Sequence, residues 1–316
     1  GSNVAIGSCA MSSNTTGGCN VGIGNKAACS NTTGAHNVAI GQLALRGNTT
    51  GTCNVALGPE SLCNSLSGSH NFAVGYRSLR NNWGGCHNTG LGFYALYTNT
   101  TGCYNIALGY NSLACNTTGG LNTGLGSQAL KCNTTGCNNN AIGDSALFNN
   151  ISGGNNNAIG PNALKCNTTG CMNTAIGGEV LKSNITGGCN NGIGQYALNK
   201  NTTGNHNTAM GQYALYANTT GCNNAAMGNQ ALVNNTTGCH NNAMGLFAGA
   251  YLANGSTALT APDNSTYLGA CTRGYAATDS NVTVIGYCAC ACGDNTVSIG
   301  NGNVTNTYIN GTTTVT

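Results

Sequence analysis

Short apolar segments recur along this chain at a constant spacing of 17 residues. Each reads Asn-x-Ala-Ile-Gly or a close variant, and the final glycines run from Gly7 to Gly245 in fourteen steps without an insertion. The residue before that glycine is always Ile, Leu, Val or Met, and the residue two before it is always Ala or Gly. Because an insertion would have to bulge out of a stack of coils, this strict spacing predicts a solenoid with one coil per unit.

The pattern within a unit predicts an all-β fold, a parallel β-solenoid (β-roll) of fifteen 17-residue coils. Alternation over five residues fits a short strand. The Asn-Thr-Thr-Gly that follows is turn chemistry, in which we expect Asn and Gly to supply tight or left-handed conformations. We expect the Ile side of the strand, and a Leu four residues after the glycine, to fill a thin core. At about 4.8 Å per coil, fifteen coils make a rod of roughly 70 Å.

Three further positions carry structural information. Asn stands four residues before each glycine, from Asn3 to Asn241, and seven residues after it from Asn14 to Asn235, except at Ser65. Since an amide side chain donates and accepts at once, we expect both Asn columns to stack as ladders between coils. The column restricted to Ala and Gly indicates close packing, either against the opposite wall of the coil or against another chain.

The repeat changes after Gly245. An irregular segment (246–270) leads to SNVTVIGYCACACGDNTVSIGNGNVTNTYINGT (280–312), where Gly286 and Gly300 are 14 residues apart. The A-x-A-x-G-D-x-x-V-x-I-G pattern resembles the head repeats of YadA-type trimeric autotransporter adhesins. The 17-residue units are similar to repeats in tail-fibre-like proteins of phages and large viruses, where a segment like NVTNTYINGT can precede a self-cleaving chaperone domain. The resemblance implies a left-handed, usually trimeric β-roll in an extracellular or virion fibre.

Two regions are therefore expected, a solenoid at 1–245 and a β-rich C-terminal segment at 246–316 that acts as a cap or subunit joint. The first coil begins at residue 3 without a capping element, and such an edge templates association. A joint between this end and the C-terminal segment would give a head-to-tail filament. The absence of an initiator Met and of a signal peptide indicates a processed or trimmed chain.

Composition narrows the function. Only 5% of the residues are charged and the net charge is +3, without a basic cluster, which argues against nucleic-acid binding. No apolar run approaches the roughly 18 residues of a membrane span. The six acidic residues are scattered, and no nucleophile–base set or phosphate loop appears, so we expect neither an enzyme nor a cofactor site. Nineteen cysteines, many Asn-x-Thr sequons and few charges favour an extracellular setting.

Most cysteines fall in a few columns on either side of the Asn-Thr-Thr-Gly turn, which suggests disulfides across it or between adjacent coils. The pairs we predict are Cys19–Cys29, Cys53–Cys63, Cys103–Cys115, Cys132–Cys137, Cys166–Cys171 and Cys222–Cys239. The remaining candidates, for bonds between subunits, are Cys9, Cys271, Cys288, Cys290 and Cys292. All five His share one column with Cys19 and Cys53 (His36, His70, His87, His206 and His240), which invites a metal hypothesis; without a closed set of four ligands, we predict no metal site.

The turn asparagines also lie in N-glycosylation sequons. They are either glycan carriers or simply good turn residues, and the candidates are Asn14, Asn31, Asn48, Asn99, Asn116, Asn133, Asn167, Asn201, Asn218 and Asn235. Further sequons begin at Asn254, Asn264, Asn281, Asn303 and Asn310.

Three functions remain. The first is a structural subunit of an extracellular filament that assembles with itself through the solenoid ends and is stapled by disulfides. The second is a trimeric adhesin or receptor-binding fibre with a cell-surface or glycan ligand. The third is an ice-binding solenoid, which is disfavoured because the threonines are adjacent and lie in a turn.

Overall fold

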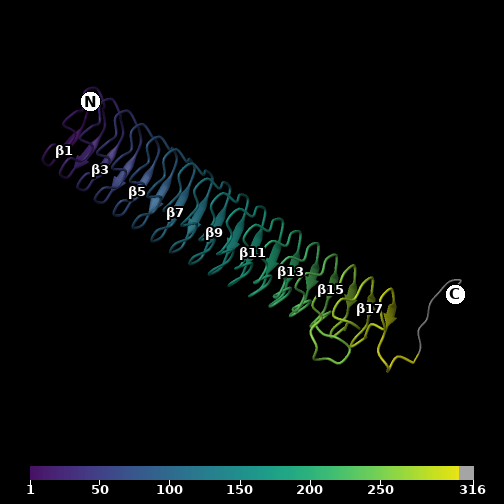
Figure 1. Ribbon diagram of the computed structural model, residues 1–316. Coiled ribbons are helices and arrows are strands. Elements are labelled where there is room, and N and C mark those ends of the chain that lie inside the picture. Colours follow the sequence, from purple (N-terminus) through teal and green to yellow (C-terminus); the bar gives the residue numbers. More distant parts are fainter. Residues whose placement is uncertain (306–316) are drawn as a thin grey trace.

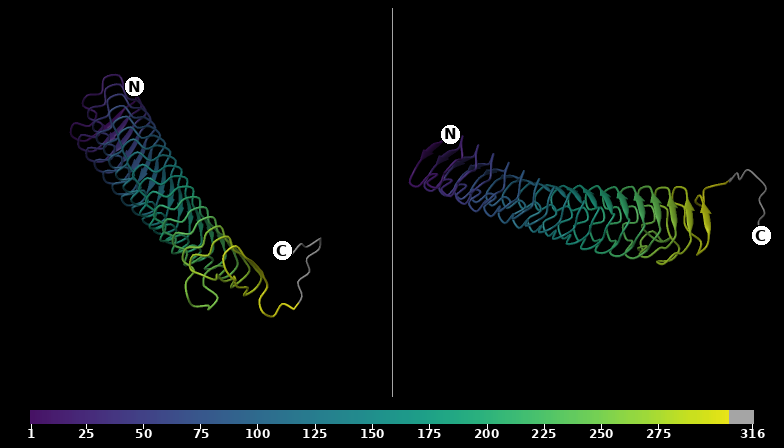
Figure 2. Two further views of the ribbon diagram at one scale, coloured as in Figure 1. Left: turned by 45° about the vertical axis from the view of Figure 1, so that its right-hand side comes forward. Right: turned by 90° about the horizontal axis from the view of Figure 1, so that it is seen from above.

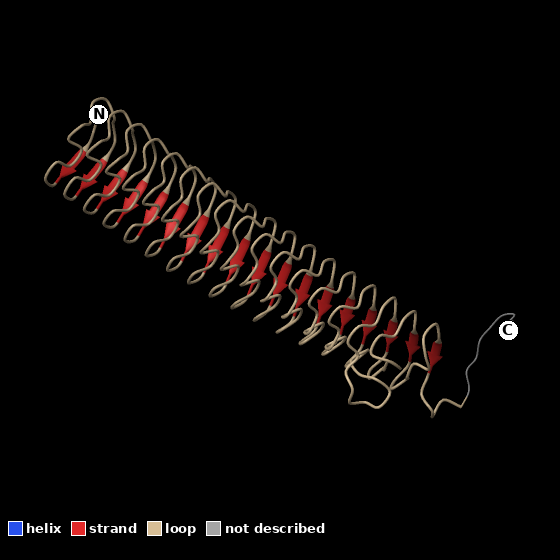
Figure 3. Cartoon of the chain, viewed as in Figure 1, coloured by secondary structure: helices blue, strands red, loops and turns tan. Residues whose placement is uncertain are grey.

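The computed structural model describes residues 1–305, and its eighteen strands form one parallel sheet (Figures 1 and 3). Each strand has three residues, and the described residues contain no helix. The strands are β1 (Val4–Ile6), β2 (Val21–Ile23), β3 (Val38–Ile40), β4 (Val55–Leu57), β5 (Phe72–Val74), β6 (Thr89–Leu91), β7 (Ile106–Leu108), β8 (Thr123–Leu125), β9 (Asn140–Ile142), β10 (Asn157–Ile159), β11 (Thr174–Ile176), β12 (Asn191–Ile193), β13 (Thr208–Met210), β14 (Ala225–Met227), β15 (Asn242–Met244), β16 (Thr266–Leu268), β17 (Thr283–Ile285) and β18 (Val297–Ile299).

Every strand pairs in register with the next one along the chain. Thr174 of β11 lies opposite Asn191 of β12, and Ile176 lies opposite Ile193. Because partners from β1 to β15 are 17 residues apart, each column of the sequence repeat becomes a column of side chains along the rod. The result is the long, narrow stack of coils in Figure 2. The predicted β-solenoid is confirmed.

The sheet does not end where the strict repeat ends. β16, β17 and β18 continue the stack, and Asn242 of β15 lies opposite Thr266 of β16. The extra residues of the coil between Gly245 and Gly269 form a loop that bulges from the rod (Figure 1). The segment NVTNTYINGT runs past residue 305, so most of it, and Asn310, lies outside the described residues.

The expectation that the Ile side of the strand fills the core is wrong. In β11 the central Ala175 is fully buried, whereas Ile176 is 39% exposed. The middle residue of each strand points inward, and the opposite wall of the same coil is close. At Gly192 a Cβ would lie 2.5 Å from Val180 Cγ1, so that coil has room for glycine only. Through β15 this column holds only Ala or Gly, whereas β16 and β17 place the buried Tyr267 and Val284 there. The core consists of these inward residues, the buried leucine column from Leu45 to Leu232 and the alanines that precede those leucines, such as Ala163 and Ala197.

Both asparagine ladders are present. In the ladder before the strands, Asn173 Nδ2 donates to Asn156 Oδ1 (3.1 Å) and to the Gly187 carbonyl (2.9 Å). In the ladder at the turns, Asn167 Nδ2 donates to Asn150 Oδ1 (2.8 Å) and to the Gly170 carbonyl (2.9 Å). These amides are fully buried, so hydrogen-bonded side chains supply much of the interior that a larger apolar core would otherwise fill.

Left-handed backbone occurs at other positions than predicted. In one coil it falls at Asn162 (φ 56°), Leu164 (φ 51°) and Met172 (φ 58°), not at the Asn-Thr-Thr-Gly turn. Gly170 of that turn is needed for space, because a Cβ would collide with the Gly187 carbonyl and with Asn167 Oδ1. The residues in left-handed conformation are held by hydrogen bonds between coils, such as Leu164 N to the Val180 carbonyl (3.0 Å).

Candidate functional site

The outward face of the sheet carries a continuous row of aliphatic side chains. We call this row the apolar ridge. It consists of the third residue of every strand: Ile6, Ile23, Ile40, Leu57, Val74, Leu91, Leu108, Leu125, Ile142, Ile159, Ile176, Ile193, Met210, Met227, Met244, Leu268, Ile285 and Ile299. At about 4.8 Å per strand the ridge is roughly 80 Å long. A soluble monomer rarely exposes so continuous an apolar surface, so the ridge is a candidate interaction surface.

A second outward column flanks the ridge and changes along the rod. It begins with Val and Phe in β1 to β5 and becomes Thr or Asn in β8 to β13. In the polar part, Asn140 Nδ2 donates to Asn157 Oδ1 at 2.9 Å. The apolar strip is therefore two residues wide near the N-terminal end and one residue wide farther along.

The cysteines that follow the turn glycine form a ladder of their own, which we call the thiol ladder. Its members are Cys86, Cys103, Cys137, Cys171, Cys222 and Cys239. In each, Sγ accepts a hydrogen bond from a backbone N–H of the preceding coil, at 3.1 to 3.4 Å. Each thiol also donates to the carbonyl two residues before it, at 3.3 to 3.5 Å. A thiol is a weak donor and a weak acceptor, and here it serves as both.

Two other residues in this column also accept a hydrogen bond from a backbone N–H of the preceding coil. Ser69 Oγ accepts from Thr52 N (3.0 Å), and Asn205 Oδ1 accepts from Gly188 N (2.7 Å). The sequence pattern predicts disulfides for most of these cysteines and does not reveal this hydrogen-bonding role. The sequence carries only a weak signal for it. The side chains of Thr52, Ser69 and Asn205 in this column can also hydrogen-bond, but its other five non-cysteine residues are Gly or Ala.

All 19 cysteines are free thiols in the structure, so none of the six predicted disulfides is closed. The pairings remain predictions, and so do the proposed intersubunit roles of the remaining candidates. Burial raises the pKa of the Cys63, Cys132, Cys239 and Cys271 thiols. These four groups are therefore protonated near neutral pH, and a protonated thiol is a poor nucleophile.

The turn sequons present buried asparagines. From Asn31 to Asn235 the side chains of these residues are at most 1% exposed. A glycan attaches to Nδ2, the atom that at Asn116 donates to Asn99 Oδ1 (2.7 Å) and to the Gly119 carbonyl (2.9 Å). Attachment would break both bonds and force a sugar into the core, which favours the turn-residue interpretation of this column. The sequons at Asn254, Asn264, Asn281 and Asn303 are exposed.

Three of the fifteen charged residues form a cluster in the coils of β4 and β5. Glu60 Oε2 forms salt bridges with Arg77 Nε (3.1 Å) and with Arg80 Nε (2.8 Å). Arg77 also donates to Tyr94 Oη (3.1 Å) and lies over the Tyr76 ring. The Arg77 hydrogen bond, helped by Arg80, lowers the pKa of Glu60 although partial burial acts in the opposite direction. Glu60 thus joins its coil to two arginines of the next coil, and the cluster acts as a brace between coils.

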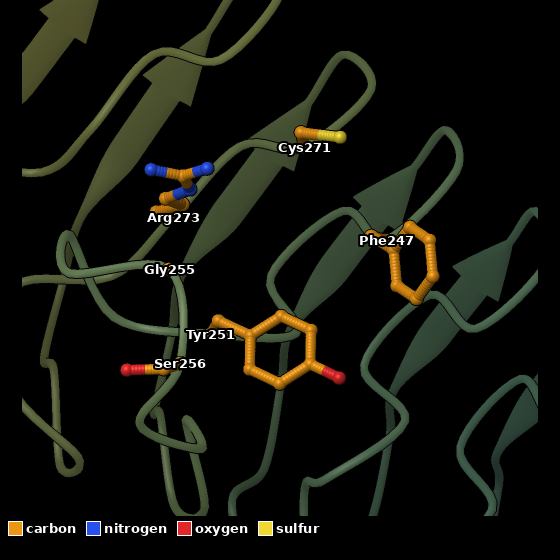
Figure 4. Close-up of a pocket in the computed structure, with 6 residues that line it drawn as sticks. All are labelled: Phe247, Tyr251, Gly255, Ser256, Cys271 and Arg273. Atoms are coloured by element: carbon orange, nitrogen blue, oxygen red, sulfur yellow. The ribbon is translucent and has the colours of Figure 1, made fainter.

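One concave site lies beside the bulging loop after β15. We call it the junction pocket (Figure 4). Its volume is about 420 Å³, and its lining residues are Phe247, Tyr251, Gly255, Ser256, Cys271 and Arg273. The sequence pattern alone does not reveal this pocket, although the 24-residue step from Gly245 to Gly269 marks the insertion that builds one wall.

The five His lie in an exposed or half-exposed column with left-handed backbone, and His70 stacks on His87 with centroids 4.8 Å apart. Within residues 1–305, no three His, Cys, Asp or Glu side chains converge in a way that could hold a metal ion. The same residues include no helix that is long and apolar enough to cross a membrane.

This chain can be classified by its fold. The chain is a parallel β-solenoid repeat protein. No protein-family model matches it, and a search of curated proteins gives no significant match.

Proposed function

We propose that this chain is a structural subunit of an extracellular fibre, in which copies of the rod associate along the apolar ridge. The observation that carries this proposal is the ridge itself, which keeps an aliphatic residue at the same outward position in all eighteen strands. Such a position does not contribute to the core of the chain, because Ile176 faces away from the core and Ala175 faces into it. Burial against another copy explains why it is apolar.

The low charge of the chain is consistent with close association of identical rods, since there is little like-charge repulsion to overcome. The resemblance to YadA-type repeats implies three copies. Lateral packing along the ridge differs from the end-to-end assembly expected from the sequence, and the two modes are compatible in one fibre.

The mass of the wild-type chain in solution tests this proposal. Under reducing conditions, which remove any disulfide link, light scattering coupled to gel filtration is expected to give a multiple of 31.6 kDa. The triple variant Ile159→Lys, Ile176→Lys, Ile193→Lys is expected to be a monomer, because three adjacent charges cannot be buried unpaired.

The matched control places three lysines in the same coils but at the exposed turn edge, at Ser152, Thr169 and Thr186. It should keep the wild-type mass. A monomeric wild type, or a ridge variant with the wild-type mass, would contradict lateral association.

The second candidate function, an adhesin or receptor-binding fibre, requires a ligand site. The junction pocket is the feature that favours it.

A further inference from the structure

The wall of the junction pocket is formed by an inserted hairpin. Tyr251 and Ala258 form an antiparallel bridge, and Leu252 N donates to the Thr257 carbonyl at 2.8 Å. Asn254 Oδ1 closes the turn by accepting from Ser256 N (3.0 Å) and Thr257 N (2.9 Å). Insertions into repeat proteins map to loops on one face, which is often the binding face. The hairpin is therefore an ordered addition to the rod.

Arg273 supplies the charge of the pocket. Its Nη1 donates to the Ala253 carbonyl at 3.3 Å, and among the described residues it makes no ion pair. By contrast, Arg77 and Arg80 are both paired with Glu60. No acidic residue lines the pocket. Burial raises the pKa of the Cys271 thiol, so this group is uncharged near neutral pH and leaves the guanidinium uncompensated.

Gly255 keeps the guanidinium in place. It has left-handed backbone (φ 74°), and a Cβ there would lie 3.3 Å from Arg273 Cζ. The hairpin backbone thus packs directly against the guanidinium and fixes one side of it. In a planar guanidinium held in this way, the remaining N–H groups are ready for bidentate contact with a carboxylate.

Two aromatic rings complete the pocket. The Phe247 and Tyr251 centroids are 6.2 Å apart and the rings are tilted by 43°. In Figure 4, Arg273 lies on one side of the Tyr251 ring and Phe247 on the other. The rings offer apolar faces beside a cation, and a volume of about 420 Å³ is within the range of small-molecule sites.

We propose that the junction pocket binds a carboxylate-bearing monosaccharide unit. The carboxylate pairs with Arg273, and the C–H face of the pyranose ring packs on Tyr251 and Phe247. A neutral sugar would leave the guanidinium unpaired, and a simple inorganic anion would leave both rings uncovered. The ligand unit has two possible sources, the terminal sialic acid of a cell-surface glycan and a uronic acid of an acidic polysaccharide. This inference does not depend on the chain forming a fibre.

The test uses the full chain and ligand-observed NMR titration with N-acetylneuraminic acid, glucuronic acid, the methyl ester of each, and glucose. At least one acid is expected to bind with a Kd of about millimolar or below. Its methyl ester, which keeps the ring and removes the charge, is expected to bind at least tenfold more weakly. Whichever acid binds more tightly identifies the source. Equal binding of acid and ester, or no saturable binding of either acid, would overturn the proposal.

Variants locate the site. Arg273→Gln is expected to weaken binding of the acid at least tenfold and to leave the weak binding of the ester unchanged. Gly255→Ala, which displaces the guanidinium, should act in the same direction. Arg46→Gln removes the same charge far from the pocket and should not change the affinity. Acid binding that survives Arg273→Gln, or falls equally in Arg46→Gln, would place the ligand elsewhere. The ester comparison on the wild-type chain decides the question even if a variant folds poorly.

Discussion

The turn ladder of asparagines has one break, at Ser65, and this break gives a quantitative test of the ladder. Asn48 Oδ1 and Ser65 Oγ are both buried and have no hydrogen-bond partner. On the other side of the break, Asn82 Nδ2 donates only to the Gly85 carbonyl, at 2.7 Å. Elsewhere the same amide also donates to the preceding coil, as Asn48 Nδ2 does to Asn31 Oδ1 at 2.7 Å.

The substitution Ser65→Asn should repair the ladder. The new Nδ2 would reach Asn48 Oδ1 and the Gly68 carbonyl, and the new Oδ1 would accept from Asn82 Nδ2. Three net hydrogen bonds contribute about 1 kcal/mol each. Ordering one amide side chain costs about 1 kcal/mol. The expected gain is about 2 kcal/mol in the free energy of local opening, or roughly a 30-fold decrease in the opening constant.

Hydrogen exchange followed by mass spectrometry measures this local quantity, because a solenoid need not unfold in one step. Peptides that span residues 48–85 should exchange about 30-fold more slowly in Ser65→Asn. Peptides from distant coils should not change, since each coil contacts only its neighbours. Ser65→Ala is the control, as it removes the unpaired hydroxyl without restoring the ladder. Unchanged or faster exchange in Ser65→Asn, or equal protection in both variants, would refute the reasoning.

Three further predictions test other parts of the rod. Asn156→Ala should destabilise its coil by about 3 kcal/mol because it leaves buried hydrogen-bond partners unsatisfied, whereas Asn157→Thr, at the exposed neighbouring position, should change stability by less than about 0.5 kcal/mol. Similar hydrogen-exchange rates in the two variants would count against the ladder. The pKa of Glu60 is lowered in the folded chain by Arg77, so the stabilisation by Glu60 is present above the ordinary carboxyl pKa and is lost as the pH falls through the lowered value. The loss of stability in Glu60→Gln should therefore be about 1 kcal/mol at neutral pH and vanish in acid, and a pH-independent loss would exclude this origin. Cys171→Ser should hardly change the stability of the chain under reducing or non-reducing conditions, because a hydroxyl can replace the thiol in both hydrogen bonds. A loss of stability of about 2 kcal/mol or more that occurs only under non-reducing conditions would instead support the predicted disulfide.

The disulfide and ladder interpretations of the cysteines can be compared in the same way for the whole set. A free-thiol count under denaturing conditions, with and without reductant, gives the number of bonded cysteines directly. If the thiol ladder is correct, its six cysteines are free, and they should react with a thiol reagent to the same extent with and without reductant. A difference of two thiols per bridge would identify each closed pair, and peptide mapping would assign it.

The period of the repeat was enough to predict the solenoid. A strict 17-residue spacing forces identical positions into register, because any shift between coils would have to be repaired at every step. Register in turn makes the asparagine ladders predictable. An amide that recurs at one position has an identical amide one coil away, and each can donate to the other. These features follow from local sequence and from translation along the rod, without knowledge of the cross-section of the coil.

The cross-section itself was decided only by the tertiary structure. The alternation Asn-x-Ala-Ile-Gly allows either Ala175 or Ile176 to face inward, and hydrophobicity alone favours the isoleucine. The opposite wall is too close for a branched side chain, so the alanine is inside and the isoleucine joins the apolar ridge. The left-handed residues, the thiol ladder and the junction pocket depend in the same way on distances between segments that are not neighbours in sequence. The sequence determined what repeats, and the packing of one wall against the other determined which side of each repeat is buried and which remains free to bind.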